Sequence, residues 1–209
     1  MRLIRIAGIV LIIGGIAVML LSLAMRISAE KQSSELVEAY LDYARHLTTE
    51  QGSEISTEVT TAVQAEATTQ AVTVPENMLG VIIIDKIDLK APLAEGTDNK
   101  SIRYALGHFK DTAMPGETGN FAVAGHRSYT FGEYFNRLDE LEKGDIIKVI
   151  YGGSTYNYEV DESFVVEPEQ VEVLESGDKA EITLVTCTPE WTATHRLIVK
   201  GHLTEDSNG

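Results

Sequence analysis

The sequence predicts a mainly β protein: a closed barrel of short strands with minor helices, preceded by one long apolar helix. Three observations support this fold class. Short apolar runs separated by polar turns fill residues 76–205 of the 209-residue chain, and many short strands at irregular spacing are typical of barrels. Gly152-Gly153-Ser154 separates two of these runs in the manner of a tight hairpin. A continuous apolar segment, residues 6–25, lies ahead of them.

The apolar segment has the length of a membrane span. Among residues 6–25 only Ser22 is polar, and at ~1.5 Å per residue a helix of ~20 residues covers about 30 Å, the thickness of a bilayer's hydrocarbon core. Arginines in residues 1–5 favour a cytoplasmic N-terminus, with everything after Arg26 outside the cell. A cleaved signal peptide would have a shorter apolar region, and Ala24-Met25-Arg26 is a poor cleavage site. We therefore expect an uncleaved anchor.

Residues 26–75 are predicted to form an extracellular stalk that is helical first and disordered afterwards. Between Glu30 and Leu47, apolar residues recur at the spacing of a short amphipathic helix. Residues 48–74 are rich in Thr, Ala, Glu and Gln and contain no aromatic residue, Pro or Cys. Such a segment cannot bury enough apolar surface to order itself.

The predicted barrel domain covers residues 76–205 and leaves residues 206–209 as a polar tail. Apolar or alternating patterns predict strands at residues 80–84, 91–94, 120–124, 145–151, 155–166, 182–186 and 197–203. Short helical patches are expected around residues 101–106, 134–141 and 168–174.

Composition narrows the partners and cofactors. A formal net charge of -15 argues against nucleic acid, because phosphate contacts need a basic surface. One cysteine and scattered histidines do not form a zinc pattern, and we expect no metal site and no cofactor. Modulation by calcium stays open, since Glu117, Glu133 and Asp139 lie in or near predicted loops.

Cys187 is the only cysteine in the chain. Structural cysteines of exported proteins come in pairs, so a lone one in this setting is a candidate reactive thiol. It ends the strand-like run 182–186, and Arg196 begins the next run nine residues later. Only the thiolate is a good nucleophile, and nearby positive charge favours it. Arg196 stays charged and could also stabilise an oxyanion during acyl transfer.

Among the histidines, His126 is the best candidate base. It follows an apolar run and a glycine, and a strand end is where a scaffold presents residues to a cleft. His195 adjoins Arg196, and repulsion between neighbouring cations makes it a worse base. His202 lies near the end of the last strand and is expected to be structural, whereas His108 could line a groove.

These residues together resemble a known family. Thr183-Leu184-Val185-Thr186-Cys187 and His195-Arg196-Leu197-Ile198-Val199 resemble the signature of sortases, the membrane-anchored cysteine transpeptidases of Gram-positive bacteria. Ala124-Gly125-His126-Arg127 resembles the family's histidine motif, and residues 107–120 resemble the segment before it. The motifs occur in the family's order, and the resemblance covers the whole predicted barrel.

The resemblance implies an eight-stranded barrel and cleavage of a Leu-Pro-X-Thr-Gly-like sorting signal between Thr and Gly. By position, Cys187 would form a thioacyl-enzyme, His126 would transfer protons, and Arg196 would orient the signal and stabilise the oxyanion. Thr186 would add a hydroxyl or backbone contact beside the nucleophile. Trp191 would wall the substrate groove or cover the end of the barrel. With His108 as a possible groove residue, these complete the expected substrate-binding set.

The expected partners are surface proteins with a C-terminal sorting signal, and an amine of a cell-wall precursor or of a pilin lysine as acceptor. An Asp-Pro-aromatic lid motif and a second apolar span, usual in pilin-polymerising sortases, are not found in the sequence. We therefore expect a lid-less wall-anchoring enzyme, class D-like or class E-like. The alternatives are a pilin-polymerising transpeptidase, a peptide hydrolase on the same barrel, and a non-catalytic membrane-tethered binding module.

Overall fold

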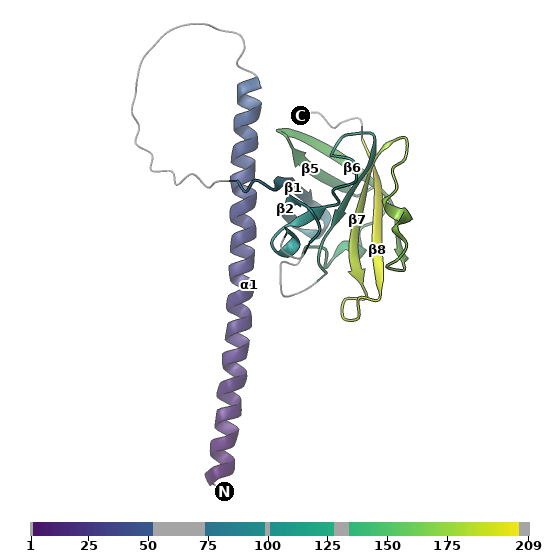
Figure 1. The fold of residues 1–209 in the computed structure, drawn as a ribbon. Coiled ribbons are helices and arrows are strands. Elements are labelled where there is room, and N and C mark those ends of the chain that lie inside the picture. Colours follow the sequence, from purple (N-terminus) through teal and green to yellow (C-terminus); the bar gives the residue numbers. More distant parts are fainter. Residues whose placement is uncertain (1, 52–73, 99–100, 128–133, 205–209) are drawn as a thin grey trace, which may run out of the picture.

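The computed structural model describes residues 2–51, 74–98, 101–127 and 134–204. A long helix, α1 (Arg2–Gln51), stands beside a β-barrel (Figure 1). The barrel contacts only the C-terminal half of the helix, and the N-terminal half extends well beyond it (Figure 1). The part of the chain predicted as a disordered stalk, residues 52–73, lies outside the described residues.

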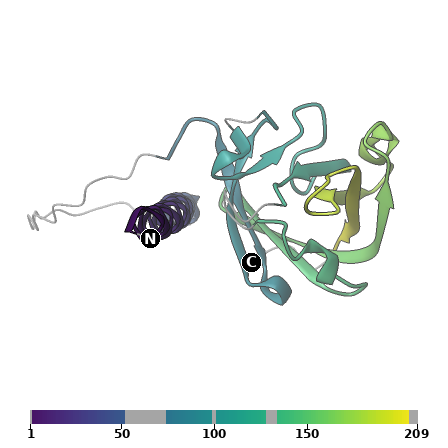
Figure 2. The ribbon, with the colours of Figure 1, turned by 90° about the horizontal axis from the view of Figure 1, so that it is seen from below.

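The described residues form eight strands, which close into one barrel in the order β1-β2-β3-β4-β7-β8-β6-β5. Figure 2 views this ring of strands from below. This arrangement confirms the predicted eight-stranded barrel. The strands are β1 (Met78–Ile84), β2 (Leu89–Glu95), β3 (Leu106–His108), β4 (Gly119–Ala124), β5 (Ile146–Tyr151), β6 (Ser154–Val166), β7 (Ala180–Thr188) and β8 (His195–Leu203).

The barrel interior is filled by alternate residues of its strands. Phe121 and Val123 of β4 belong to the core, as do Ile182 and Leu184 of β7. Because side chains of a strand alternate between its two faces, the residues between them face outward. The hairpin between β5 and β6 has the expected two-residue turn. Gly152 and Gly153 have φ values of 59° and 84°, as a type I′ turn requires.

The structure differs from the predicted elements in two places within the barrel. Leu106, expected in a helical patch, begins β3, which pairs with β2 and with β4. Three residues are too few to show a strand period, so local pattern could not identify this strand. The expected helical patches are reduced to single 3-10 turns, which are η2 (Ser101–Arg103), η3 (Leu138–Glu140) and η4 (Val171–Leu174), and a further turn, η1 (Asp85–Ile87), follows β1.

The predicted short helix of residues 30–47 is not separate but continues the apolar helix without a break. No glycine or proline lies between Gly15 and Gly52 to end it. From Leu11 to Met25 every side chain is exposed, and the helix is long and apolar enough to cross a membrane. That length and composition fit the predicted anchor.

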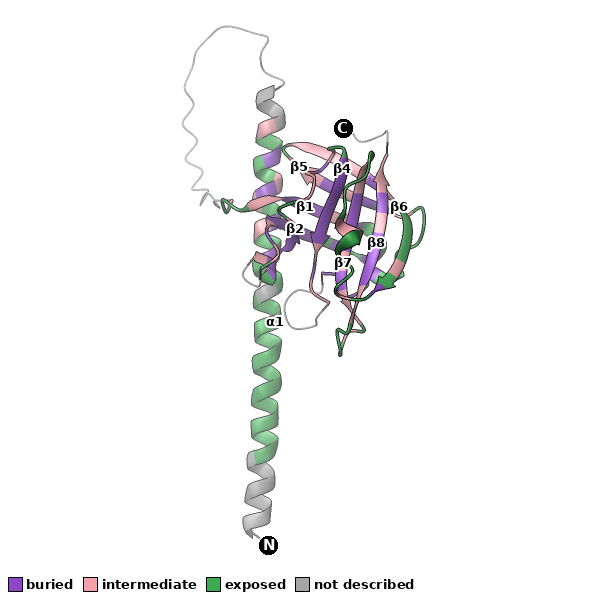
Figure 3. Ribbon diagram, turned by 45° about the vertical axis from the view of Figure 1, so that its right-hand side comes forward, coloured by how far each residue is buried: buried purple, intermediate pink, exposed green. Residues whose placement is uncertain are grey.

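The C-terminal half of α1 packs on the outside of the barrel. Val37, Tyr40 and Ala44 are buried there against Val81 of β1. Figure 3 shows buried residues on α1 only where it lies beside β1 and β2. The backbone N–H of Gly152 donates to the Tyr40 hydroxyl at 3.1 Å. The helix thus holds the barrel through both apolar and polar contacts.

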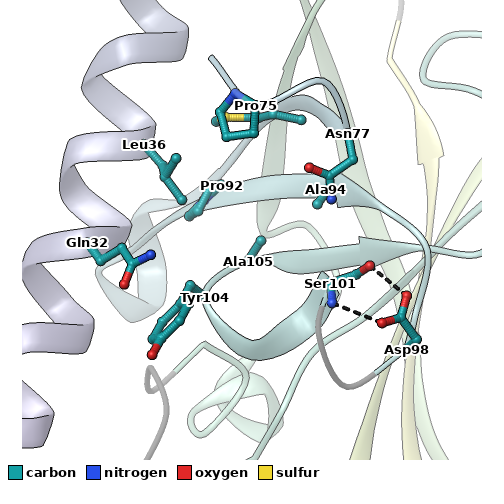
Figure 4. A pocket seen from close by; sticks show the side chains of 11 residues that line it. Gln32, Leu36, Pro75, Asn77, Pro92, Ala94, Asp98, Ser101, Tyr104 and Ala105 are labelled. Carbon is teal, nitrogen blue, oxygen red and sulfur yellow. Dashed lines mark hydrogen bonds between the residues drawn. The ribbon is translucent and has the colours of Figure 1, made fainter. Parts of the chain in front are cut away.

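A pocket of about 460 Å³ separates α1 from the barrel below this contact (Figure 4). Gln32 and Leu36 line it from the helix, and Pro92, Ala94 and Tyr104 line it from the barrel. It borders β2, which lies across the barrel from β8 in the strand order. The pocket is therefore separate from the strands that carry Cys187 and Arg196.

Candidate active site

The nucleophile candidate and the arginine are paired across two strands. β7 and β8 are antiparallel, and in their register Cys187 lies directly opposite Arg196. Directly opposite residues of an antiparallel pair project to the same face with Cβ atoms ~5 Å apart. The spacing of nine residues in the sequence therefore corresponds to a hairpin that brings Arg196 back beside Cys187.

His126 is brought to this pair by β4, which runs parallel to β7. Ala124 lies opposite Val185 in their register. Two further hydrogen bonds continue the contact. The N–H of Gly125 donates to the Val185 carbonyl at 3.1 Å, and the Thr186 hydroxyl donates to the Gly125 carbonyl at 2.8 Å. Continued for two residues past the end of β4, the register predicts that His126 lies alongside Cys187.

All three candidates share the outer face of the sheet. The core residues of β4 have odd numbers, and those of β7 have even numbers. His126 and Cys187 belong to the alternate positions, whose side chains face outward. Cys187 and Arg196 face the same way because they are directly paired. Continued past the end of β4, this alternation predicts that a thiol, an imidazole and a guanidinium lie together where β4, β7 and β8 run side by side.

The environment of His126 favours a neutral imidazole. The residue is half-buried, and this burial lowers the pKa of His126 below its ordinary value of 6.5. Its backbone carbonyl accepts a hydrogen bond from the N–H of Phe135 at 3.2 Å. The ring can therefore accept a proton near neutral pH, and its backbone is fixed on the side away from β7.

Arg196 is held by the loop that precedes it. Its Nη1 donates to the carbonyls of Ala193 at 3.1 Å and His195 at 2.9 Å. Ala193 has a φ of 51°, so the loop turns sharply just before β8. A guanidinium has five N–H donors, and those on its other edge can serve an oxygen of a substrate.

The side chains of Thr186 and His108 are buried and have polar partners within the barrel domain. Thr186 is 2% exposed, and its hydroxyl is used on Gly125. His108 is 1% exposed inside the barrel. Its Nδ1 lies 3.1 Å from a Glu95 carboxylate oxygen, and its Nε2 lies 3.0 Å from the Thr112 hydroxyl. Contact with a substrate stays a prediction for both residues, and their burial favours a structural role instead.

Trp191 lies in the loop between β7 and β8 and is 86% exposed. Together with Thr188, Pro189 and Glu190 it lines a hollow of about 390 Å³ beside the end of β7. The same hollow is lined by Arg127 and by the core residue Leu197, so it lies on the opposite side of the sheet from Cys187. A role for Trp191 as a wall of the substrate groove or as a cover of the barrel end stays a prediction.

The remaining histidines of the barrel lie beside carboxylates at the surface. His195 lies 3.2 Å from a carboxylate oxygen of Glu167, and His202 lies 2.9 Å from one of Asp161. Because both partners lie on β6 or directly after it, these contacts connect β8 to that neighbouring strand.

The residues considered for calcium have other partners. Glu117 accepts a hydrogen bond from the N–H of Met114, and Asp139 pairs with Arg127 at 2.8 Å. Glu133 lies outside the described residues. Within the described ranges, no group of three or more His, Cys, Asp or Glu side chains is arranged to hold a metal ion.

Arg127, which adjoins His126, has a buried side chain that no sequence pattern predicts. Its side chain is only 7% exposed and contacts Thr188, Asp139 and Glu190. No local pattern distinguishes such an arginine from a solvated one. Its place directly after the candidate base was the single available signal.

Residues 82–204 match the Sortase domain family. The sortase SrtE1 of Streptomyces coelicolor is 38% identical over 148 residues, which make up 63% of this chain and 42% of that protein. Sortase D of Bacillus subtilis is 32% identical over 111 residues, 53% of this chain and 54% of that protein. The chain thus spans about half the length of these two relatives.

A solved structure of a Clostridium perfringens sortase D5 transpeptidase superimposes with a TM-score of 0.63 at 31% identity. The match covers 85% of this chain and 99% of that one. Similarity to sortases of classes D and E agrees with the expected subclass. The fold, the matched residues 82–204 and these relatives together show that this chain belongs to the sortase family.

Proposed function

We propose that this chain is a cysteine transpeptidase that cleaves a Leu-Pro-X-Thr-Gly-like sorting signal after Thr and transfers the acyl group to a cell-wall amine. The observation that supports it best is the register of three neighbouring strands. This register pairs Cys187 with Arg196, and its continuation past the end of β4 predicts that His126 comes beside the thiol. A nucleophile, a proton carrier and an anion-stabilising donor are the groups that acyl transfer needs.

In the first half of the reaction, neutral His126 takes the proton of the Cys187 thiol, and the resulting thiolate attacks the carbonyl carbon of the Thr residue in the signal. A C–S bond forms, and the carbonyl π electrons move to oxygen, where the Arg196 guanidinium stabilises the oxyanion. Collapse of this intermediate breaks the C–N bond to Gly. His126, as imidazolium, gives its proton to the departing amine. A thioacyl-enzyme remains.

In the second half, neutral His126 removes a proton from the acceptor amine as its nitrogen attacks the thioacyl carbon. A new C–N bond forms, the C–S bond breaks, and Cys187 leaves as thiolate. Burial lowers the pKa of His126, which favours the neutral ring that this step requires. The cycle ends with a thiolate and an imidazolium, and return of the proton to Cys187 restores the neutral pair that the burial of His126 favours.

We further propose that residues 6–25 anchor the chain in the cell membrane, with residues 1–5 in the cytoplasm and the barrel outside. The exposed apolar side chains from Leu11 to Met25 support this placement. The loop between β7 and β8 lies at the end of the barrel nearer the N-terminal half of α1 (Figure 1). The proposed site would therefore work close to the membrane, on surface proteins that carry a sorting signal.

The test uses the full chain in detergent micelles with a panel of sorting-signal peptides. Each peptide is incubated with and without triglycine or diaminopimelate, and the products are identified by mass spectrometry. We expect ligation at Thr that depends on the amine and is lost in Cys187→Ala and His126→Gln. The matched control is His202→Gln, which changes a histidine paired with Asp161 away from the site.

Each other result identifies another function. Cleavage that ignores the added amine would indicate a hydrolase, and ligation only to a lysine-bearing pilin peptide would indicate a pilin-polymerising enzyme. No cleavage and no thioacyl adduct with any peptide would contradict the proposal and favour a binding module.

A further inference from the structure

We propose that Arg127 is a positioning residue of the active site, whose buried guanidinium holds the end of β7 and the β7–β8 loop in place beside His126. The proposal rests on the transpeptidase function proposed above and assigns a residue that this function does not itself require. Its basis is a set of three contacts made by one side chain.

The guanidinium connects three segments that are distant in the sequence. Nη1 donates to the Thr188 hydroxyl at 3.2 Å, and Thr188 directly follows Cys187. Nη2 lies 2.8 Å from a carboxylate oxygen of Asp139 in η3 and 3.6 Å from one of Glu190 in the β7–β8 loop. One side chain after β4 therefore fixes both the strand that carries the thiol and the loop that leads to Arg196.

The alternation of side chains places Arg127 on the opposite face from the reacting groups. His126 and Cys187 face outward, so their next neighbours, Arg127 and Thr188, face the end of the barrel interior. The burial agrees with this direction, because the Arg127 side chain is 7% exposed. Arg127 thus lies on the opposite side of the sheet from Cys187, where it lines the hollow beside the end of β7 together with Thr188 and Glu190.

The charges explain why an arginine is needed at this position. Asp139 and Glu190 both approach the same Nη2, so the guanidinium lies between two carboxylates. Without it, these like charges would face each other and push the loop away from η3. A planar guanidinium can also serve the hydroxyl and the carboxylates at the same time, whereas a lysine ammonium offers one compact charge.

The experiment compares Arg127→Met and Arg127→Lys with the wild-type full chain in detergent micelles. Arg137→Met is the matched control, because Arg137 also bridges two carboxylates, those of Asp88 and Glu140, but contacts neither β7 nor its loop. We measure kcat and KM with the peptide that the wild type cleaves best. Independently, we measure the rate of Cys187 alkylation by iodoacetamide as a function of pH, and the melting temperature.

For Arg127→Met we expect kcat to fall about 10–100-fold with little change in KM, because a displacement of ~1 Å between reacting groups has an effect of this size. Arg127→Lys should recover part of the loss. The pH profile of alkylation should change in Arg127→Met, since it depends on how His126 lies against the thiol, and should not change in Arg137→Met.

Two results would overturn the proposal: kcat and alkylation equal to wild type in a folded Arg127→Met, or equal losses in Arg137→Met. If Arg127→Met does not fold, the same measurements are made on Arg127→Lys and Thr188→Val. Wild-type kcat and alkylation in both of these variants would overturn the proposal. If the wild type cleaves no peptide, the transpeptidase function fails. Alkylation then still tests Arg127 by itself.

Discussion

The hydroxyl of Thr186 should be essential for placing His126, and Thr186→Val tests this with almost no change in side-chain shape. Thr186 is 2% exposed, and its hydroxyl donates to the Gly125 carbonyl at 2.8 Å. Gly125 directly precedes His126, and its N–H is bonded to Val185. Valine keeps the branched shape but removes the donor, so one of the two bonds that align Gly125 with β7 is lost.

The magnitude follows from the burial of this bond. A buried acceptor left without its donor costs about 1–3 kcal/mol, which for a barrel of this size lowers the melting temperature by roughly 4 °C per kcal/mol. Because the freed carbonyl belongs to the residue before His126, the ring should shift relative to Cys187. A shift of ~1 Å can lower kcat by up to about 100-fold.

Thr186→Ser is the control that separates the two effects. It keeps the donor but loses a buried methyl group, so it should lose stability while retaining most of kcat. Thermal unfolding and peptide ligation are measured for both variants. If Thr186→Val ligates as fast as wild type, or if Thr186→Ser loses as much kcat as Thr186→Val, the hydroxyl does not position His126.

Three further outcomes are expected. In the folded chain, burial lowers the pKa of His126 below 6.5, so the unfolded chain binds a proton there more readily. The contribution of the neutral ring to stability is therefore fully present above pH 6.5, and it is lost as the pH falls through the lower folded pKa. The melting temperature should therefore fall more on acidification in wild type than in His126→Gln, and equal slopes would contradict this. Gly125→Ala should cost about 1–3 kcal/mol, measured by urea unfolding, because its Cβ would lie 2.5 Å from a Phe135 ring atom. Tyr40→Phe removes the acceptor for the Gly152 N–H and should weaken docking of α1 by about 1 kcal/mol, seen as faster hydrogen exchange of that amide; unchanged exchange would mean that the bond does not form in solution.

Much of the fold could be predicted because its strands carry a local signal. Residues 156–160 alternate clearly between apolar and polar side chains, and the two glycines before this strand favour the hairpin that the structure has. β3 could not be predicted, since three residues carry no period and its position is set by its partners β2 and β4. The continuity of α1 was also missed, because a change in composition after residue 25 was interpreted as the end of an element.

The candidate site was predictable to a different degree for each residue. The hairpin distance between Cys187 and Arg196 is visible in the sequence, because β7 and β8 are consecutive. The approach of His126 to Cys187 depends on a parallel pairing of β4 with β7, strands separated by some 60 residues, and no local pattern reveals it. The burial of His108 and Arg127 likewise arises only when distant segments enclose them.

The same alternation that builds the core also builds the site. Ile182 and Leu184 fill the barrel, and Cys187 faces outward because it lies an odd number of residues from them. A slip of β7 by one residue against β4 would turn Cys187 into the barrel and expose the core residues. The two hydrogen bonds of Gly125 to Val185 and Thr186 oppose such a slip at the end of the sheet where it would matter most. Fixing the register there therefore serves stability and catalysis at once, which is why we expect Thr186→Val to affect both.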